Sequence, residues 1–148
     1  MEVQQDFKEL LELFNDHKVE YMIVGGYALA FHGAPRYTGD IDLLVKPDEA
    51  NALRVIEALD EFGFGSVGLE KNDFMYQDKV VQLGVPPVRI DIITSISGVS
   101  WEEALNGAMK GKYGEILVLY IGRDQFIKNK RAIGRRKDQA DLEALGEE

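Results

Sequence analysis

Two aspartates with one residue between them are the first feature of the sequence that suggests chemistry. Asp40 and Asp42 flank Ile41 at the start of an apolar run that ends at Val45. If this run is a β-strand, both carboxylates point to the same face of the sheet, where their like charges repel. A divalent cation would relieve the repulsion, so the pair predicts a metal site. A solvated turn is the alternative, but the apolar neighbours argue against it because unpaired carboxylates are costly to bury.

A third carboxylate stands in another run of β-like residues. Asp91 lies in the middle of Val88–Ile93. If the two strands are neighbours, Asp91 faces the same point as the first two aspartates. Three carboxylates without cysteine or a suitably placed histidine favour a hard ion such as Mg²⁺ or Mn²⁺ over zinc. Alternatively, Arg89 or another cation simply pairs with Asp91, and the pattern leaves both interpretations open.

A glycine pair precedes the first two aspartates. Gly25 and Gly26 follow a short apolar run and stand before a helix expected at residues 27–32. Glycine lets the backbone approach a ligand closely, and the amides at a helix N-terminus bind phosphate, so the pair is a candidate phosphate contact. Arg36 and Thr38 are further candidates, since a guanidinium matches phosphate oxygens. Arg36 could equally neutralise the aspartates.

The charge of the chain is distributed unevenly. The chain has 26 acidic and 17 basic residues and a net charge of −9, which argues against binding an extended duplex nucleic acid. Residues 123–137 instead carry seven lysines or arginines and one acid, Asp124. A short cationic segment on an acidic body suits a compact phosphate ligand. Lys130, Arg136 and Lys137 are the candidate contacts, although any one of them could be a solvated helix residue.

The elements that must position these residues follow from hydrophobic spacing and from glycine and proline signals. Helices are expected at residues 3–17, 27–32, 48–62, 100–107, 122–133 and 136–145, and strands at 21–24, 40–45, 80–83, 88–93 and 116–121. Residues 64–76 are expected to form a loop with at most a short edge strand. The order of elements predicts an α/β (α+β) fold with a mixed sheet of four to five strands flanked by helices.

Length and composition add a domain prediction and exclude several classes of protein. A chain of 148 residues without a visible linker predicts a single domain, residues 1–148, with a C-terminal helical segment at about 123–145. No apolar run reaches the ~18 residues that a membrane span needs. The N-terminus lacks the basic and apolar regions of a signal peptide, and there is no cysteine. A cytoplasmic protein is therefore expected.

The pattern of glycines and acids resembles the nucleotidyltransferase superfamily, whose fold is shared with DNA polymerase beta. The signature of that superfamily is h-G-[GS], about ten residues, then D-h-[DE]-h, with a third acid on a later strand. Residues 25–43, GGYALAFHGAPRYTGDIDL, are similar to the branch that includes abortive-infection and toxin–antitoxin nucleotidyltransferases. Residues 129–142, NKRAIGRRKDQADL, are similar to the C-terminal motif of that branch. Gly26 stands where many members carry serine.

The resemblance implies a metal-dependent nucleotidyltransferase with an NTP as substrate. Asp40, Asp42 and Asp91 would be the catalytic residues and would hold Mg²⁺ or Mn²⁺, as two ions. A nucleoside monophosphate would move to a hydroxyl of a protein or RNA acceptor, with release of pyrophosphate. The implied nucleotide-binding residues are Gly25, Gly26, Arg36, Thr38, Lys130, Arg136 and Lys137.

The resemblance also implies a role as a toxin–antitoxin component with a partner protein. The alternative is a non-catalytic module on the same fold that binds a nucleotide or a partner. A third hypothesis is a metallophosphohydrolase that holds its metal by carboxylates. Such an enzyme would release phosphate rather than pyrophosphate.

Overall fold

The helices and strands follow the predicted order closely. The computed structural model describes residues 3–34, 39–85 and 88–147. The helices are α1 (Gln5–Asp16), α2 (Gly25–Phe31), α3 (Glu49–Leu59), α4 (Asn72–Met75), α5 (Trp101–Gly107), α6 (Arg123–Ile133) and α7 (Arg136–Ala144). The strands are β1 (Tyr21–Val24), β2 (Asp40–Val45), β3 (Val80–Val85), β4 (Val88–Ile93), β5 (Met109–Tyr113) and β6 (Ile116–Tyr120).

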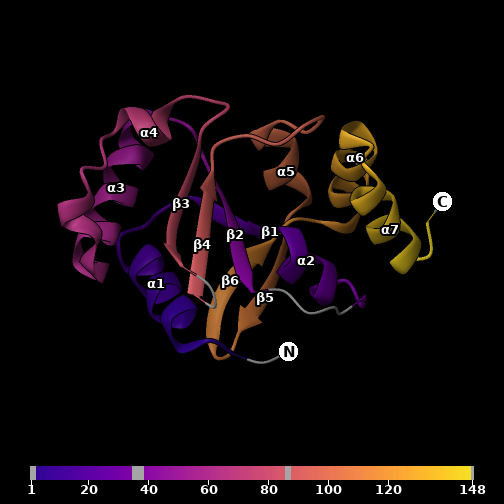
Figure 1. Cartoon of the computed structure of the whole chain (residues 1–148), viewed down its shortest axis with the longest axis horizontal. Helices are drawn as coiled ribbons and strands as arrows, with labels where there is room; N and C mark the ends of the chain where they lie inside the picture. Colours follow the sequence, from indigo (N-terminus) through magenta and orange to yellow (C-terminus); the bar gives the residue numbers. More distant parts are fainter. Residues whose placement is uncertain (1–2, 35–38, 86–87, 148) are drawn as a thin grey trace.

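The strands form one mixed sheet in the order β3-β4-β2-β1-β6-β5 (Figure 1). β2 runs parallel to β4, and β1 runs parallel to β6. The other three neighbouring pairs, β1–β2, β3–β4 and β5–β6, are antiparallel. The predicted mixed α/β fold is confirmed. The sheet has six strands, whereas four to five were predicted, and the additional strand is β5, which was not expected from the sequence.

Helices lie on both sides of the sheet (Figure 1). In Figure 1, α1, α3 and α4 lie to one side of the sheet, and α5, α6 and α7 lie to the other. Aromatic rings fasten α1 and α2 to the sheet: the ring of Phe14 lies 5.2 Å from that of Tyr21, and the ring of Phe31 stacks on Tyr120 at 4.1 Å. The face beneath α1 and α2 is thus an apolar core, and the acids must project from the opposite face.

The register of β1 and β2 is held by one buried side chain, Asn51 of α3. Its amide oxygen accepts from the backbone N–H of Glu20 at 2.8 Å. Its amide nitrogen donates to the carbonyls of Glu20 and Lys46 at 2.9 and 3.0 Å. These bonds tie the residue before β1 to the residue after β2, where Tyr21 pairs with Val45. The acids at the other end of β2 are therefore fixed relative to β1.

The structure differs from the sequence prediction in three short segments. α2 begins at Gly25, so the glycine pair forms the first turn of the helix and does not precede it. α3 ends at Leu59, and a π-helical turn, Asp60–Phe64, follows it with Gly63 at a φ of 116°. The expected loop at 64–76 contains α4, which buries Phe74, and it contains no strand. None of the helices described in the structure has the length and apolar character needed to cross a bilayer.

Candidate active site

The three candidate acids lie at one end of the two central strands. In the parallel pair β2–β4, Asp42 is the register partner of Asp91, and Asp40 is the register partner of Arg89. Paired residues point to the same face, and side chains two residues apart on a strand do so as well. The structure therefore brings the three carboxylates together on one face, with the Arg89 side chain among them.

Arg89 bridges the two outer carboxylates. Its Nε and one terminal nitrogen donate to the two oxygens of Asp91 at 3.1 and 2.9 Å. The same terminal nitrogen lies 3.2 Å from a carboxylate oxygen of Asp40. The side chain of Asp91 is 10% exposed, whereas those of Arg89 and Asp40 are 32% and 35% exposed. Arg89 and Asp40 therefore lie at the solvent-exposed rim of the cluster. The pairing of Arg89 with Asp91 is thus present in the structure.

Asp42 is the acid whose ionisation the fold disfavours most clearly. Its pKa is raised from 3.8 to about 6. Burial is the largest cause, followed by the charge of Asp91, a hydrogen bond with Asp91 and the charge of Asp40. The nearby charge of Lys130 acts in the opposite direction. An additional positive charge beside Asp42 would favour its ionised form.

Gly25 closes the site from the side of β1 and α2. Its φ is +68°, a conformation that glycine adopts at little cost. A Cβ atom at this position would lie 2.1 Å from a carboxylate oxygen of Asp42, so the backbone approaches the acid more closely than a side chain would allow. The first glycine of the motif is thus needed for the position of Asp42, and Gly26 is buried beside it in α2.

The donor set of the cluster fits a hard divalent cation, because it offers only carboxylate oxygens. In the described part of the chain, however, no three His, Cys, Asp or Glu side chains are arranged to hold a metal ion as they stand. In this arrangement the Arg89 guanidinium contacts both oxygens of Asp91 and one oxygen of Asp40.

Lys130 reaches the vicinity of the acids from α6, but its ammonium is already paired. It lies 3.3 Å from Asp138 and 3.4 Å from Asp141, and its side chain is only 10% exposed. Asp138 also accepts from Nε of Arg135 at 2.8 Å. A cavity of about 500 Å³ between α6 and α7 has Lys130 in its wall. The sequence analysis did not single out the two aspartates, although they stand three residues apart on one helix face.

Replacing Asp138 with asparagine is expected to destabilise the protein by roughly 2 kcal/mol at neutral pH. The hydrogen bond from Arg135 lowers the pKa of Asp138 from 3.8 to about 2, with a further contribution from Lys130. A depressed pKa stabilises the fold above the ordinary pKa, and this stabilisation is lost as the pH falls toward the folded value. Urea unfolding should therefore show a difference between the two proteins that shrinks as the pH falls from about 4 toward 2. A difference that is absent at pH 7, or that Glu143→Gln on the same helix reproduces, would contradict this.

Two other predicted phosphate contacts lie on α7. Arg136 and Lys137 are exposed in the first turn of this helix. Arg36 and Thr38 lie outside the described residues. His32 follows the last residue of α2, and its Nε2 lies 2.7 Å from the carbonyl oxygen of Ile121, which agrees with a packing role.

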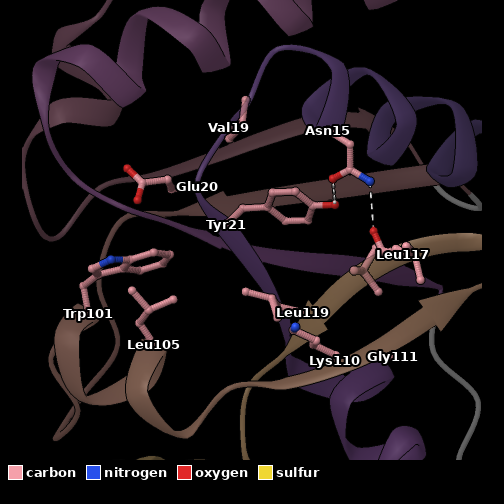
Figure 2. Close-up of a pocket in the computed structure, with 11 residues that line it drawn as sticks. Asn15, Val19, Glu20, Tyr21, Trp101, Leu105, Lys110, Gly111, Leu117 and Leu119 are labelled. Atoms are coloured by element: carbon pink, nitrogen blue, oxygen red, sulfur yellow. Dashed lines mark hydrogen bonds between the residues drawn. The ribbon is translucent and has the colours of Figure 1, made fainter.

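A cavity of about 480 Å³ lies apart from the acid cluster, between the end of α1, the start of β1, α5 and the β5–β6 hairpin. Figure 2 shows Trp101 and Leu105 of α5 on one side of it and Tyr21 and Leu119 on the other. The side-chain amide of Asn15 accepts a hydrogen bond from the hydroxyl of Tyr21 and donates one to the carbonyl of Leu117 in β6. None of the described candidate residues lines this cavity.

Comparison with known proteins places the fold. Neither a protein-family model nor a curated protein sequence matches the chain. A candidate nucleotidyltransferase from Thermotoga maritima superposes with a TM-score of 0.63 and 12% identity, over 94% of this chain and 89% of its own. The lincosamide antibiotic adenylyltransferase LnuA, solved with lincomycin bound, gives a TM-score of 0.58 and 15% identity over 97% and 96% of the two chains.

The antibiotic-resistance factor ANT(2'')-Ia is a third similar structure, with a TM-score of 0.61 and 12% identity over 95% of this chain and 80% of its own. Identities this low establish the architecture alone. The agreement nevertheless extends over nearly the whole chain in each case, and it includes the sheet that carries the acids. The chain therefore has the fold of the nucleotidyltransferase superfamily.

Proposed function

We propose that this protein is a divalent-metal-dependent nucleotidyltransferase, which moves a nucleoside monophosphate from an NTP to a hydroxyl of a protein or RNA acceptor. The observation that carries the proposal is the pairing of Asp42 with Asp91 in register on two parallel strands. The backbone of Gly25 lies so near the Asp42 carboxylate that no side chain would fit between them. The fold is shared with the lincosamide antibiotic adenylyltransferase LnuA and with the antibiotic-resistance factor ANT(2'')-Ia. The resemblance of residues 25–43 and 129–142 to toxin–antitoxin enzymes supports a role in such a pair, with a partner protein.

The residues of the cluster divide the work of the reaction. Asp40, Asp42 and Asp91 would hold Mg²⁺ or Mn²⁺, as two ions, and bound metal would neutralise phosphate charge and make the acceptor hydroxyl more acidic. Gly25 and Gly26 place backbone without side chains next to the acids, where the phosphates can approach. The cations of residues 123–137, with Arg36 and Thr38, would meet the charge of the phosphates.

The proposed step is an in-line displacement at the α-phosphate. The acceptor hydroxyl loses its proton to a carboxylate of the cluster, for which Asp91 is the candidate. The hydroxyl oxygen then bonds to the α-phosphorus as the bond from this phosphorus to the bridging oxygen of the β-phosphate breaks. Pyrophosphate leaves, and the nucleoside monophosphate stays on the acceptor.

A small hydroxyl-bearing molecule is the second candidate acceptor. LnuA binds lincomycin, and 96% of its chain is covered by this one, so a protein of similar length accommodates such a compound. The chemistry at the acids would be the same. Only the surface that presents the hydroxyl would differ.

Incubation with each α-labelled NTP, Mg²⁺ or Mn²⁺ and a cell extract tests the proposal. We expect one or more of the four nucleotides to label a macromolecule, with pyrophosphate released in equal amount and with no label when EDTA is present. Protease and ribonuclease treatment of the product separates protein from RNA acceptors, and label in a small organic product identifies the second candidate. Free phosphate as the product would favour a metallophosphohydrolase. Absence of metal-dependent NTP binding in calorimetry would favour a non-catalytic module.

A further inference from the structure

The space between Asp40 and Asp91 is filled by a group of the protein itself. We propose that Arg89 is the resident counter-cation of the acid cluster, and that a divalent cation binds by displacing the Arg89 guanidinium from Asp91 and Asp40. This inference rests on the proposed function, because it concerns how the same site is loaded. It assigns Arg89 a role in metal affinity that is separate from the roles of the carboxylates.

The contacts of Arg89 use the oxygens that a metal would need. Two parallel hydrogen bonds of 3.1 and 2.9 Å occupy both oxygens of Asp91, and a third contact of 3.2 Å occupies one oxygen of Asp40. Charge-assisted, bidentate bonds of this kind are the strong ones among hydrogen bonds. A hard cation would bind these same oxygens, and two cations this close together repel each other, so the guanidinium and the metal compete for the site. Metal affinity is therefore lowered by the free energy of the arginine contacts.

The surroundings of Arg89 allow the guanidinium to leave. On the β2 side its register partner is Asp40, whereas on the β3 side its partner is Gly84, which has no side chain. The side chain is 32% exposed, so it is not enclosed by packing. A rotation toward Gly84 would therefore meet no side chain from this register partner on β3. Gln82, the register partner of Asp91 on β3, stays beside the vacated carboxylate.

A divalent ion also brings more positive charge to the carboxylates than the guanidinium that it displaces. Arg89 carries one positive charge and contacts Asp91 and Asp40. A divalent ion at the same oxygens carries two positive charges, so the exchange is favourable when metal is present.

The experiment measures Mn²⁺ binding without nucleotide, by calorimetry and by the loss of the free-ion signal in electron paramagnetic resonance. Arg89→Gln is expected to bind Mn²⁺ about tenfold more tightly than the wild type, because the competing cation is gone. Arg89→Lys should lie between the two, since an ammonium cannot make two parallel bonds to Asp91. Arg54→Gln is the matched control, because the ion pair of Arg54 on α3 is with Glu20, which is not one of the three aspartates of the cluster. It should keep wild-type affinity.

Three outcomes would overturn the inference, and they differ in what else they affect. Equal or weaker Mn²⁺ binding by folded Arg89→Gln refutes the displacement and leaves the proposed function intact. No Mn²⁺ binding by either protein refutes the metal dependence in the proposed function as well. If the variant does not fold, the Arg89 Nε–H resonance of the wild type decides, assigned by its absence in Arg89→Lys. Mg²⁺ should shift this resonance and speed its exchange with water, and an unchanged resonance at saturating Mg²⁺ refutes the inference.

Discussion

Replacing Asp42 with asparagine is expected to reduce nucleotide transfer by about a thousandfold or more, and at the same time to make the metal-free protein more stable. Activity falls because the amide removes a negative ligand from the centre of the cluster, between Asp91 on the neighbouring strand and Gly25. The shape of the side chain is nearly unchanged, so the fold should persist. The loss of activity and the gain in stability both result from removing the negative charge of the Asp42 carboxylate.

The gain in stability follows from the raised pKa of Asp42. Because burial and Asp91 raise the folded pKa from 3.8 to about 6, the protonated form is favoured in the fold. The stability that this carboxyl contributes is complete below its ordinary pKa and is lost as the pH rises through about 6. At pH 7.5 without metal, Asp42→Asn should therefore be more stable than the wild type by roughly 1 to 3 kcal/mol. The difference should shrink when Mg²⁺ is added.

Two measurements check this prediction: transfer of label from an α-labelled NTP, and urea unfolding at pH 7.5 with and without Mg²⁺. Asp16→Asn, which removes an exposed carboxylate at the end of α1, is the matched control and should change neither by much. Full transfer activity in Asp42→Asn would refute the assigned catalytic role. A variant that is less stable than the wild type without metal would refute the electrostatic argument.

Gly25→Ala is expected to lower transfer activity by at least about a hundredfold and to destabilise the fold by roughly 2 kcal/mol or more. The added methyl group would lie 2.1 Å from the Asp42 carboxylate, and the backbone at this position has a φ of +68°. Asp42 must therefore move, or α2 must shift away from β2. Both responses displace a carboxylate from the cluster.

Gly68→Ala separates the collision from the backbone strain. Gly68 has a φ of +80°, and an added Cβ there meets no atom within 4 Å. This variant should lose only about 1 kcal/mol of stability and should keep its activity. Urea unfolding and the labelled-NTP assay compare the two. If Gly25→Ala were no worse than Gly68→Ala in both assays, the close approach of Gly25 to Asp42 would have no functional importance.

The sequence predicts the interior of this fold better than its edges. β1 is buried at all four positions, and such runs of apolar residues identify a strand without any tertiary information. β5 reads Met-Lys-Gly-Lys-Tyr, and only Tyr113 of these residues is buried. It is a strand because β6 offers it hydrogen-bond partners, from Met109–Tyr120 to Tyr113–Ile116. An edge strand with exposed lysines carries no alternation of apolar residues that a sequence pattern could reveal.

The segment after α3 was unpredictable for a different reason. α4 spans four residues and buries one side chain, Phe74. Hydrophobic spacing cannot identify a helix that is little longer than one turn. Its position depends on contact with α3, which the local sequence does not encode.

The acids of the candidate site could be identified from spacing, but the full pairing of the cations could not. The spacing of Asp40 and Asp42 predicts a shared face, and the β-like run around Asp91 predicts a second strand. Arg89 and Asp91 are two residues apart on that strand, so their pairing could be suggested from the sequence, whereas the contact of Arg89 with Asp40 depends on the register of β2 against β4, which only the tertiary structure shows. The same holds for Lys130, whose partners on α7 become neighbours only after α6 and α7 pack together.

The acids are attached to interior strands, which has a kinetic consequence. β2 and β4 are each hydrogen-bonded on both edges, so their amide protons should exchange with solvent only when the whole molecule unfolds. Backbone opening is then too rare to admit a ligand within a catalytic cycle. Side-chain rotation at the surface takes picoseconds to nanoseconds, so exchange of the counter-cation at the rim would not limit turnover. We therefore expect chemistry or product release to set the rate, and sheet-loosening substitutions to reduce the amount of folded protein before they reduce kcat.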